Sequence, residues 1–128
     1  MIAMREIVAV VAEYFKCEPE TVIRGYGERA ILQRQIAMLL CRNLGGYRNF
    51  EIAEHFNQDK RVVSYSIITM KKKLKEDRQF GNYNIRTITR NIFKTVLQAA
   101  GEDKDINQAQ AVLIFARLRA DTQTEETS

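Results

Sequence analysis

Apolar side chains recur along most of the chain at steps of three and four residues, the spacing that places them on one face of an α-helix. This pattern predicts helices over residues 2–16, 30–43, 85–100 and 106–120, and Pro19 opens a further short helical turn. Gly45-Gly46 ends the central helix, and residues 76–84 are expected to form a loop around Gly81. The chain is therefore expected to be all-α.

The faces of three helices follow from the same spacing. In the central helix we expect a buried face of Ile31, Leu32, Ile36, Leu39 and Leu40 and a polar face of Arg29, Gln33 and Arg34. In the first helix the apolar stripe carries Ile7, Val8, Val11, Tyr14 and Phe15. In the helix over residues 85–100 we expect Ile85, Ile88, Ile92, Val96 and Ala99 inside and Arg86, Arg90 and Lys94 outside.

Residues 49–74 are expected to form two helices joined by a tight polar turn. Asn49 stands where a capping residue is expected, and Asn57-Gln58-Asp59 interrupts the apolar pattern. A short helix, a turn of three or four residues and a second helix with a polar start is the helix-turn-helix arrangement. Two amphipathic helices with a short loop also occur in most all-helical domains, so the pattern alone leaves both interpretations open. In the second helix Val63, Ile67, Met70 and Leu74 share the inner face, whereas Lys60, Arg61, Ser64 and Lys71 face elsewhere.

Length and charge narrow the interpretation. The chain has 128 residues, 45% of them hydrophobic, which is enough for one compact core. Residues 1–100 carry 17 Lys and Arg against 10 Asp and Glu, and residues 101–128 carry 3 against 6. A basic body favours an anionic partner, and nucleic acid is the simplest one. We expect one domain over residues 1–100, a C-terminal segment over 101–120 whose helix packs on it or on a partner, and a disordered acidic tail over 121–128.

Other functional classes find little support. No apolar run is long enough to span a membrane and no leader peptide is recognisable, so a cytoplasmic location is expected. Cys17 and Cys41 are interpreted as small buried residues in a reducing compartment. His55 is the only histidine and has no nucleophile or second ligand at a suitable spacing, so we expect neither an enzyme nor a metal site. The loop from Arg24 to Arg29 lacks the preceding strand and following Gly-Lys-Ser/Thr of a nucleotide cradle, and no cofactor is expected.

Several short segments together resemble one family. They are REIV from residue 5, VAEYF from residue 11, QRQIAM from residue 33, EIA from residue 51 and the Asp59 to Val63 spacing. Over residues 4–77 the chain resembles the C-terminal DNA-binding domain of the bacterial replication initiator DnaA. The resemblance implies an all-α helix-turn-helix fold of the Trp-repressor-like type, here with an additional C-terminal helical extension. It also implies a recognition helix in the major groove and a basic loop that reaches the minor groove and the backbone.

Matched positions and departures follow from that resemblance. Arg24 falls in the basic loop, Arg34 matches the Arg of the family's RQ pair, and Asp59 matches the Asp that opens its recognition motif. Where the family has Asp-His-Thr-Thr-Val, this chain has Asp-Lys-Arg-Val-Val, and its basic loop contains Gly25, Tyr26, Gly27 and Glu28. The family's standard site is therefore not expected. With no ATPase domain before it, the chain is expected to be a stand-alone relative encoded by a bacterium, phage or plasmid.

The leading hypothesis is a non-enzymatic protein that binds double-stranded DNA sequence-specifically in transcription or replication control, close to the nucleoid. Bases would be read by Lys60 and Arg61 with support from Gln58, Asp59, Ser64 and Tyr65, and phosphates would be held by Arg24, Arg29, Arg34 and Lys71. The alternative is a protein–protein interaction module that keeps the fold without specific DNA binding and docks on a replication or transcription protein. A homodimer through residues 106–120 is compatible with either hypothesis.

Overall fold

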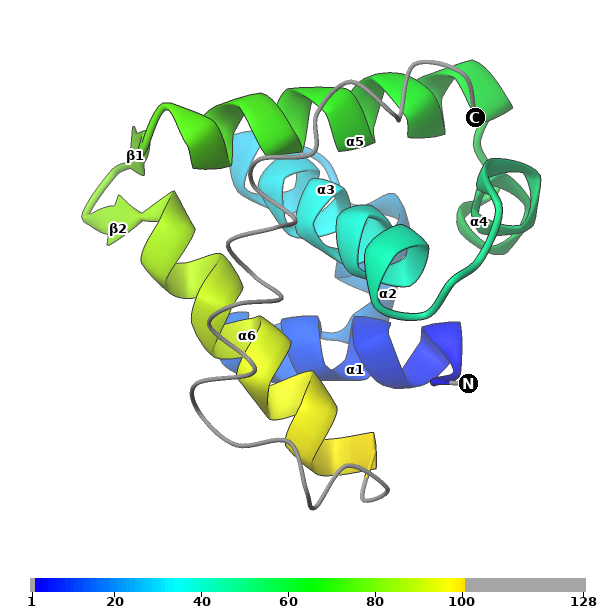
Figure 1. Ribbon diagram of the computed structural model, residues 1–128, viewed down its shortest axis with the longest axis horizontal. Helices are drawn as coiled ribbons and strands as arrows, with labels where there is room; N and C mark the ends of the chain where they lie inside the picture. Colours follow the sequence, from blue (N-terminus) through cyan, green and yellow to red (C-terminus); the bar gives the residue numbers. More distant parts are fainter. Residues whose placement is uncertain (1, 101–128) are drawn as a thin grey trace.

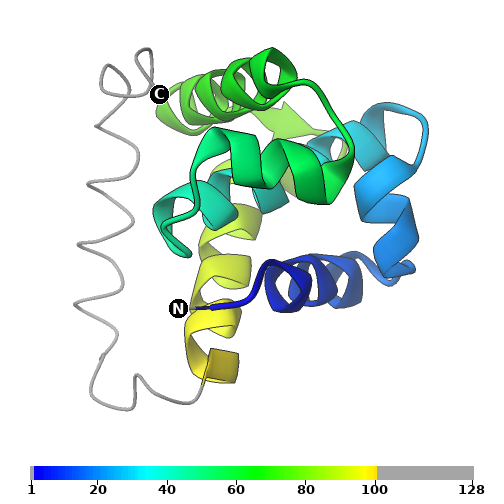
Figure 2. The same ribbon diagram turned by 90° about the vertical axis from the view of Figure 1, so that its right-hand side faces the viewer.

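The computed structural model describes residues 2–100, except for the side chain of Ala100, and these residues form six helices and one small hairpin (Figures 1 and 2). The all-α class is thereby confirmed. The expected helix over residues 106–120 and the acidic tail lie outside the described residues. In chain order the elements are α1 (Met4–Phe15), α2 (Pro19–Arg24), α3 (Glu28–Asn43), α4 (Asn49–Phe56), α5 (Lys60–Lys75), β1 (Gln79–Phe80), β2 (Tyr83–Asn84) and α6 (Ile85–Ala100).

Helix α3 runs through the middle of the structure, between α1 and α2 on one side and α5 on the other (Figure 1). Residues 35–41 of this helix are all buried. The expected polar face was wrong at Gln33, which is only 2% exposed and accepts a hydrogen bond from the Cys17 thiol at 3.6 Å. Ile31, expected inside, is 46% exposed. A helix packed on opposite sides has no broad polar face, which explains the burial of Gln33. Ile31 lies in the first turn of α3 and lines an open cavity.

Helix α1 ends because Lys16 adopts a left-handed conformation at φ 57°, and Pro19 then opens α2 at a position where its missing N–H costs nothing. The α1 residues expected inside are buried, except that Tyr14 is 38% exposed. Among the helices of residues 2–100, none is long and apolar enough to cross a membrane.

The helix-turn-helix is built from α4 and α5, and Asn57 ends α4 in a left-handed conformation at φ 52°. The cap of α4 is Arg48 rather than Asn49, which occupies the first helical position with a buried side chain. On α5 the expected inner face is confirmed, since Val63, Ile67, Met70 and Leu74 are fully buried. Lys71 is buried as well, contrary to expectation. The later part of α5 packs against both α3 and α6, and little of its circumference faces solvent there.

Residues 76–84 form more than the expected loop, because Gln79 pairs with Asn84 and Phe80 with Tyr83 in a two-stranded hairpin. Helix α6 then follows as expected and packs on α1 and α5. Its buried face holds Ile85, Ile88, Ile92 and Val96, but Ala99 is exposed, and Phe93 and Leu97 complete that face instead. The hairpin and α6 thus cover the side of the core remote from the turn between α4 and α5.

Candidate nucleic-acid interface

The start of α5 is fixed by Asp59, whose carboxylate accepts a hydrogen bond from the backbone N–H of Arg61 at 2.8 Å. This bond, together with a second from the Arg61 side chain, lowers the pKa of Asp59 below its ordinary value. The Arg61 guanidinium lies 3.3 Å from the same carboxylate, yet its side chain is 93% exposed. Because an exposed ion pair of this kind is weak, Arg61 can exchange Asp59 for a new partner at little cost.

The first two turns of α5 present an exposed face. Lys60 and Arg61 are exposed, Val62 is 41% exposed and Tyr65 is 69% exposed. This face lies at the start of a helix that follows a tight turn. It combines two cationic donors with the apolar side chain of Val62 and the phenol of Tyr65. In DNA, the major groove accommodates an α-helix, guanine accepts bonds from Lys or Arg, and the thymine methyl contacts apolar side chains.

The loop between α2 and α3 is held in one shape by Arg34. Its guanidinium donates to the carbonyl oxygens of Val22 at 3.0 Å and Gly25 at 2.7 Å, and its partial burial lowers its pKa. Gly25 is required here because a Cβ would lie 2.5 Å from the Thr21 carbonyl oxygen. Gly27 caps α3 at φ 95°, in the region that favours glycine. Arg34 therefore positions the loop, a role that the sequence analysis did not assign to it.

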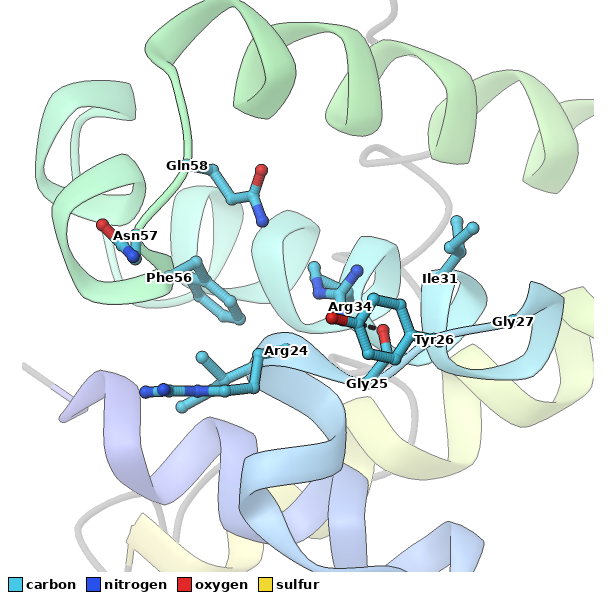
Figure 3. A pocket seen from close by; sticks show the side chains of 10 residues that line it. Arg24, Gly25, Tyr26, Gly27, Ile31, Arg34, Phe56, Asn57 and Gln58 are labelled. Atoms are coloured by element: carbon cyan, nitrogen blue, oxygen red, sulfur yellow. Dashed lines mark hydrogen bonds between the residues drawn. The ribbon is translucent and has the colours of Figure 1, made fainter.

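A cavity of about 370 Å³ separates this loop from the turn that precedes α5 (Figure 3). It brings together three of the expected contact residues, Arg24, Arg34 and Gln58. Arg24 pairs with Glu20 at 3.0 Å, but both side chains are about 70% exposed and easily rearranged. With the Arg34 guanidinium bound to two carbonyl oxygens, the exposed Arg24 guanidinium and the Gln58 amide are the groups at this open cavity that suit an anionic ligand such as a phosphodiester.

A second cavity, of about 300 Å³, adds two cationic residues that the sequence analysis missed. Arg42 and Arg48 line it together with Lys60, Phe50 and Asn49. The buried Asn49 Oδ1 has no hydrogen-bond partner among the described residues. Arg42 lies near the end of α3 and Arg48 lies just before α4. The two residues share a cavity with the start of α5 only because the helices pack together, which the sequence alone does not show. Their common feature in the sequence is a position at a helix end beside Gly45-Gly46.

Three expected contact residues are placed differently. Arg29 lies 5.6 Å from the ring centres of both Phe15 and Tyr83 and donates to the Tyr83 hydroxyl at 3.3 Å, so it is engaged with the hairpin. Ser64 accepts a hydrogen bond from Asn49 Nδ2 at 2.8 Å and joins the two helices of the motif. Lys71 is buried in α5 and does not present its side chain at the surface.

Comparison with known proteins identifies this arrangement. A family model described as the bacterial DnaA protein helix-turn-helix matches residues 4–70, from α1 to the second half of α5. The chain belongs to this family. Membership in it implies DNA binding. No solved structure shows a significant match to the chain.

Similar proteins include chromosomal replication initiator proteins of the DnaA type from two species of Chlamydia. The chain is 38% identical over 72 residues to DnaA 1 of Chlamydia trachomatis, a match that covers 56% of this chain and 16% of that protein. It is 30% identical over 94 residues to DnaA 2 of Chlamydia caviae, which covers 73% of this chain and 20% of that protein. The chain thus spans about a fifth or less of the length of these relatives.

Proposed function

We propose that this protein binds double-stranded DNA sequence-specifically, without enzymatic activity, and places the first two turns of α5 in the major groove. One observation carries the proposal. The inner face of α5 is fully buried at Val63 and Ile67, while Lys60 and Arg61 at its start are exposed and follow a capped three-residue turn. The core thereby fixes the helix, and its exposed end is left available for base edges.

The contacts divide into those that read bases and those that hold the backbone. Lys60 and Arg61 supply donors for guanine, and Val62 supplies an apolar contact for a thymine methyl. Gln58 stands at the cavity rim in the turn and is placed to support them. On the two flanks of α5, Arg24 at one cavity and Arg42 and Arg48 at the other are assigned to phosphates.

The process we propose is transcription or replication control at the bacterial nucleoid, in the cytoplasm. Support comes from the family match and from relatives that are named chromosomal replication initiators. The departure at Lys60 and Arg61 leads us to propose a target site different from the standard site of the family. Since the exposed cations act as donors rather than as nucleophiles or metal ligands, the proposal requires no cofactor.

The test is selection of duplexes from a random library, followed by anisotropy titration of the selected duplex and a scrambled one at two salt concentrations. We expect salt-dependent binding to both and clear preference for the selected duplex. Arg61→Ala should weaken binding to the selected duplex by about tenfold and change binding to the scrambled duplex little. Arg48→Ala should weaken both equally and flatten the salt dependence, as expected for a phosphate contact.

A matched control lies at the other end of α5. Arg78 pairs with Glu76 two residues before it, as Arg61 pairs with Asp59, and it is half exposed. Arg78→Ala should therefore leave the preference for the selected duplex unchanged. If Arg61→Ala and Arg78→Ala behave alike, α5 does not read bases at its start. Weak and equal binding to both duplexes would instead favour the protein–protein interaction module.

A further inference from the structure

A third cavity, of about 560 Å³, lies between the start of α1 and helix α4, and we call it the α1–α4 groove. Met4 and Phe50 supply apolar side chains to it, Glu51 and Glu54 supply carboxylates, and His55 completes the lining. Phe50 is 54% exposed, although the other apolar side chains of α4 are buried. The packing of the core does not account for this apolar and acidic surface.

The polar groups of the groove are only partly satisfied. His55 Nε2 is buried without a hydrogen-bond partner among the described residues. The Glu51 carboxylate accepts a hydrogen bond from the Arg48 backbone N–H at 2.8 Å. Glu54 is exposed, and none of the ion pairs within residues 2–100 involves it. Since buried polar groups are normally paired, the groove has the character of a surface that is still to be covered.

Helix α6 directs the rest of the chain toward this groove. It begins beside the end of α1, because the Tyr83 ring, two residues before α6, contacts the Phe15 ring at 5.9 Å between centres. From there α6 runs back across α1, and both views show its end close to the start of α1, which carries Met4 (Figures 1 and 2). The chain after residue 100 therefore starts on the side of the molecule where the groove lies.

The sequence after α6 has a pattern complementary to the groove. In the helix predicted over residues 106–120, one apolar stripe contains Ile106, Ala109, Val112, Leu113 and Ala116. At about 100° per residue, Arg117 and Arg119 fall on opposite borders of this stripe. The segment contains no Asp or Glu. An apolar stripe bordered by arginines matches a groove in which apolar side chains lie beside carboxylates.

We propose that residues 106–120 of this chain dock in the α1–α4 groove, with the apolar stripe on Met4 and Phe50 and the arginines facing Glu51 and Glu54. The inference goes beyond the proposed function, because it concerns a contact of the chain with itself and not with DNA. A helix of this length spans about 22 Å, enough to cover α4 from end to end.

The short connection decides between the chain's own segment and that of a second copy. Residues 101–105 are the only spacer between α6 and the docking segment. A tether this short gives an effective concentration in the millimolar range, far above that of a second copy in dilute solution. The docked segment then supports α4, which is joined to α5 by the hydrogen bond between Asn49 and Ser64.

A tryptophan reporter tests the docking, because the chain has no tryptophan of its own. Phe50→Trp places the reporter in the groove, and Tyr26→Trp, at a 98% exposed position in the loop before α3, is the matched control. Leu113→Glu then puts a charge into the apolar stripe. In the Phe50→Trp chain we expect this change to shift the emission to the red and to raise acrylamide quenching to the level of the control. In the Tyr26→Trp chain it should change neither, and circular dichroism would verify folding.

A charge reversal tests the pairing of the arginines with the groove. In the Phe50→Trp chain, Glu54→Arg should expose the reporter as Leu113→Glu does, because it faces Arg117 and Arg119 with a like charge. Adding Arg117→Glu and Arg119→Glu should restore the spectrum of the covered reporter. Such a rescue by reversed charge cannot arise from a loss of folding.

Two results would overturn the proposal. The groove is empty if the Phe50→Trp reporter is quenched as readily as the control or does not respond to Leu113→Glu. The occupant is a second copy if the reporter becomes exposed on about hundredfold dilution while light scattering shows a dimer dissociating. These measurements contain no DNA, so a failure of the proposed function would leave their outcome unchanged.

Discussion

Asn49 Nδ2 donates a hydrogen bond to Ser64 Oγ at 2.8 Å, and this bond joins the first helical position of α4 to the second turn of α5. Asn49 is only 3% exposed, so its amide cannot turn to water if the partner is lost. We therefore expect Ser64→Ala to destabilise the fold by about 1–3 kcal/mol, the usual cost of an unpaired buried polar group. Urea unfolding would measure the loss.

A double-mutant cycle provides the control for this bond. In an Asn49→Ala background the amide is already absent, and Ser64→Ala should then cost much less. If Ser64→Ala instead leaves the unfolding curve unchanged and weakens DNA binding, Ser64 contacts the duplex and the bond to Asn49 is dispensable.

Replacement of Arg34 should destabilise the fold even when the new residue is lysine. A lysine keeps the charge but cannot reach the Val22 and Gly25 carbonyl oxygens together, because the two bonds use different nitrogens of a planar guanidinium. We expect Arg34→Lys to lower the free energy of unfolding by about 1–3 kcal/mol and to raise hydrogen exchange in the loop at residues 25–27. Arg24→Lys, at the end of α2 directly before this loop, is the control and should change stability by about 0.5 kcal/mol or less, since only an exposed ion pair is affected. Equal effects of the two variants would argue against a role of Arg34 in holding the loop.

The cap of α5 should be sensitive to acid. Hydrogen bonds from the Arg61 backbone N–H and side chain lower the pKa of Asp59 in the folded protein. A lowered folded-state pKa means that the ionised carboxylate stabilises the fold above the unfolded-state value of about 3.9 and that this contribution is lost as pH falls through the folded-state pKa. Asp59→Asn keeps an oxygen acceptor without the charge. The wild type should be more stable than this variant at neutral pH, and the difference should shrink below about pH 4; a difference independent of pH would contradict the assignment.

Arg29 should behave as a structural residue. Its guanidinium sits against the Phe15 and Tyr83 rings, 5.6 Å from each ring centre, and holds the hairpin to α1 and α3. We expect Arg29→Ala to destabilise the protein by about 0.5–2 kcal/mol and to leave the salt dependence of DNA binding unchanged. A flattened salt dependence in this variant would restore Arg29 to the phosphate contacts.

The two cysteines should differ in reactivity. Burial raises the pKa of the Cys41 thiol to about 12, and its side chain is fully buried in α3. Cys17 is partly exposed, although burial raises its pKa as well. Because the thiolate is the reactive form, a thiol reagent at pH 8 should label Cys17 first and Cys41 only when the protein unfolds. Equal labelling rates in the folded protein would show that α3 opens locally.

The sequence pattern was most informative where a helix has one buried face. On α5 the steps from Val63 to Leu74 predicted the inner face correctly, because that helix begins at the surface. On α3 the same reasoning failed at Gln33, because neighbours pack on opposite sides and no polar stripe is needed. It failed at Ile31 because this residue lines the open cavity beside the loop between α2 and α3. The burial of Lys71 has the same origin, since α6 adds a second packing surface that is distant in the sequence.

The candidate interface could be predicted only in part. Asp59, Lys60 and Arg61 are contiguous, so a cap followed by exposed cations can be recognised from local order alone. Arg42 and Arg48 lie at the same surface only because α4 packs beside α5. The hydrogen bonds of Arg34 go to two carbonyl oxygens, and the local sequence does not show in which direction these oxygens point. Spacing along one helix carries no information about such contacts between elements.

Two side chains fix the backbone of the interface. Arg34 donates hydrogen bonds to carbonyl oxygens, and Asp59 accepts one from the backbone N–H of Arg61. The exposed side chains of Tyr26, Lys60 and Tyr65 lie outside the core. Exchange of these three residues should therefore leave the fold intact. Under the proposed function, a few point mutations at the two positions on α5 would change the target sequence without compensating changes in the core.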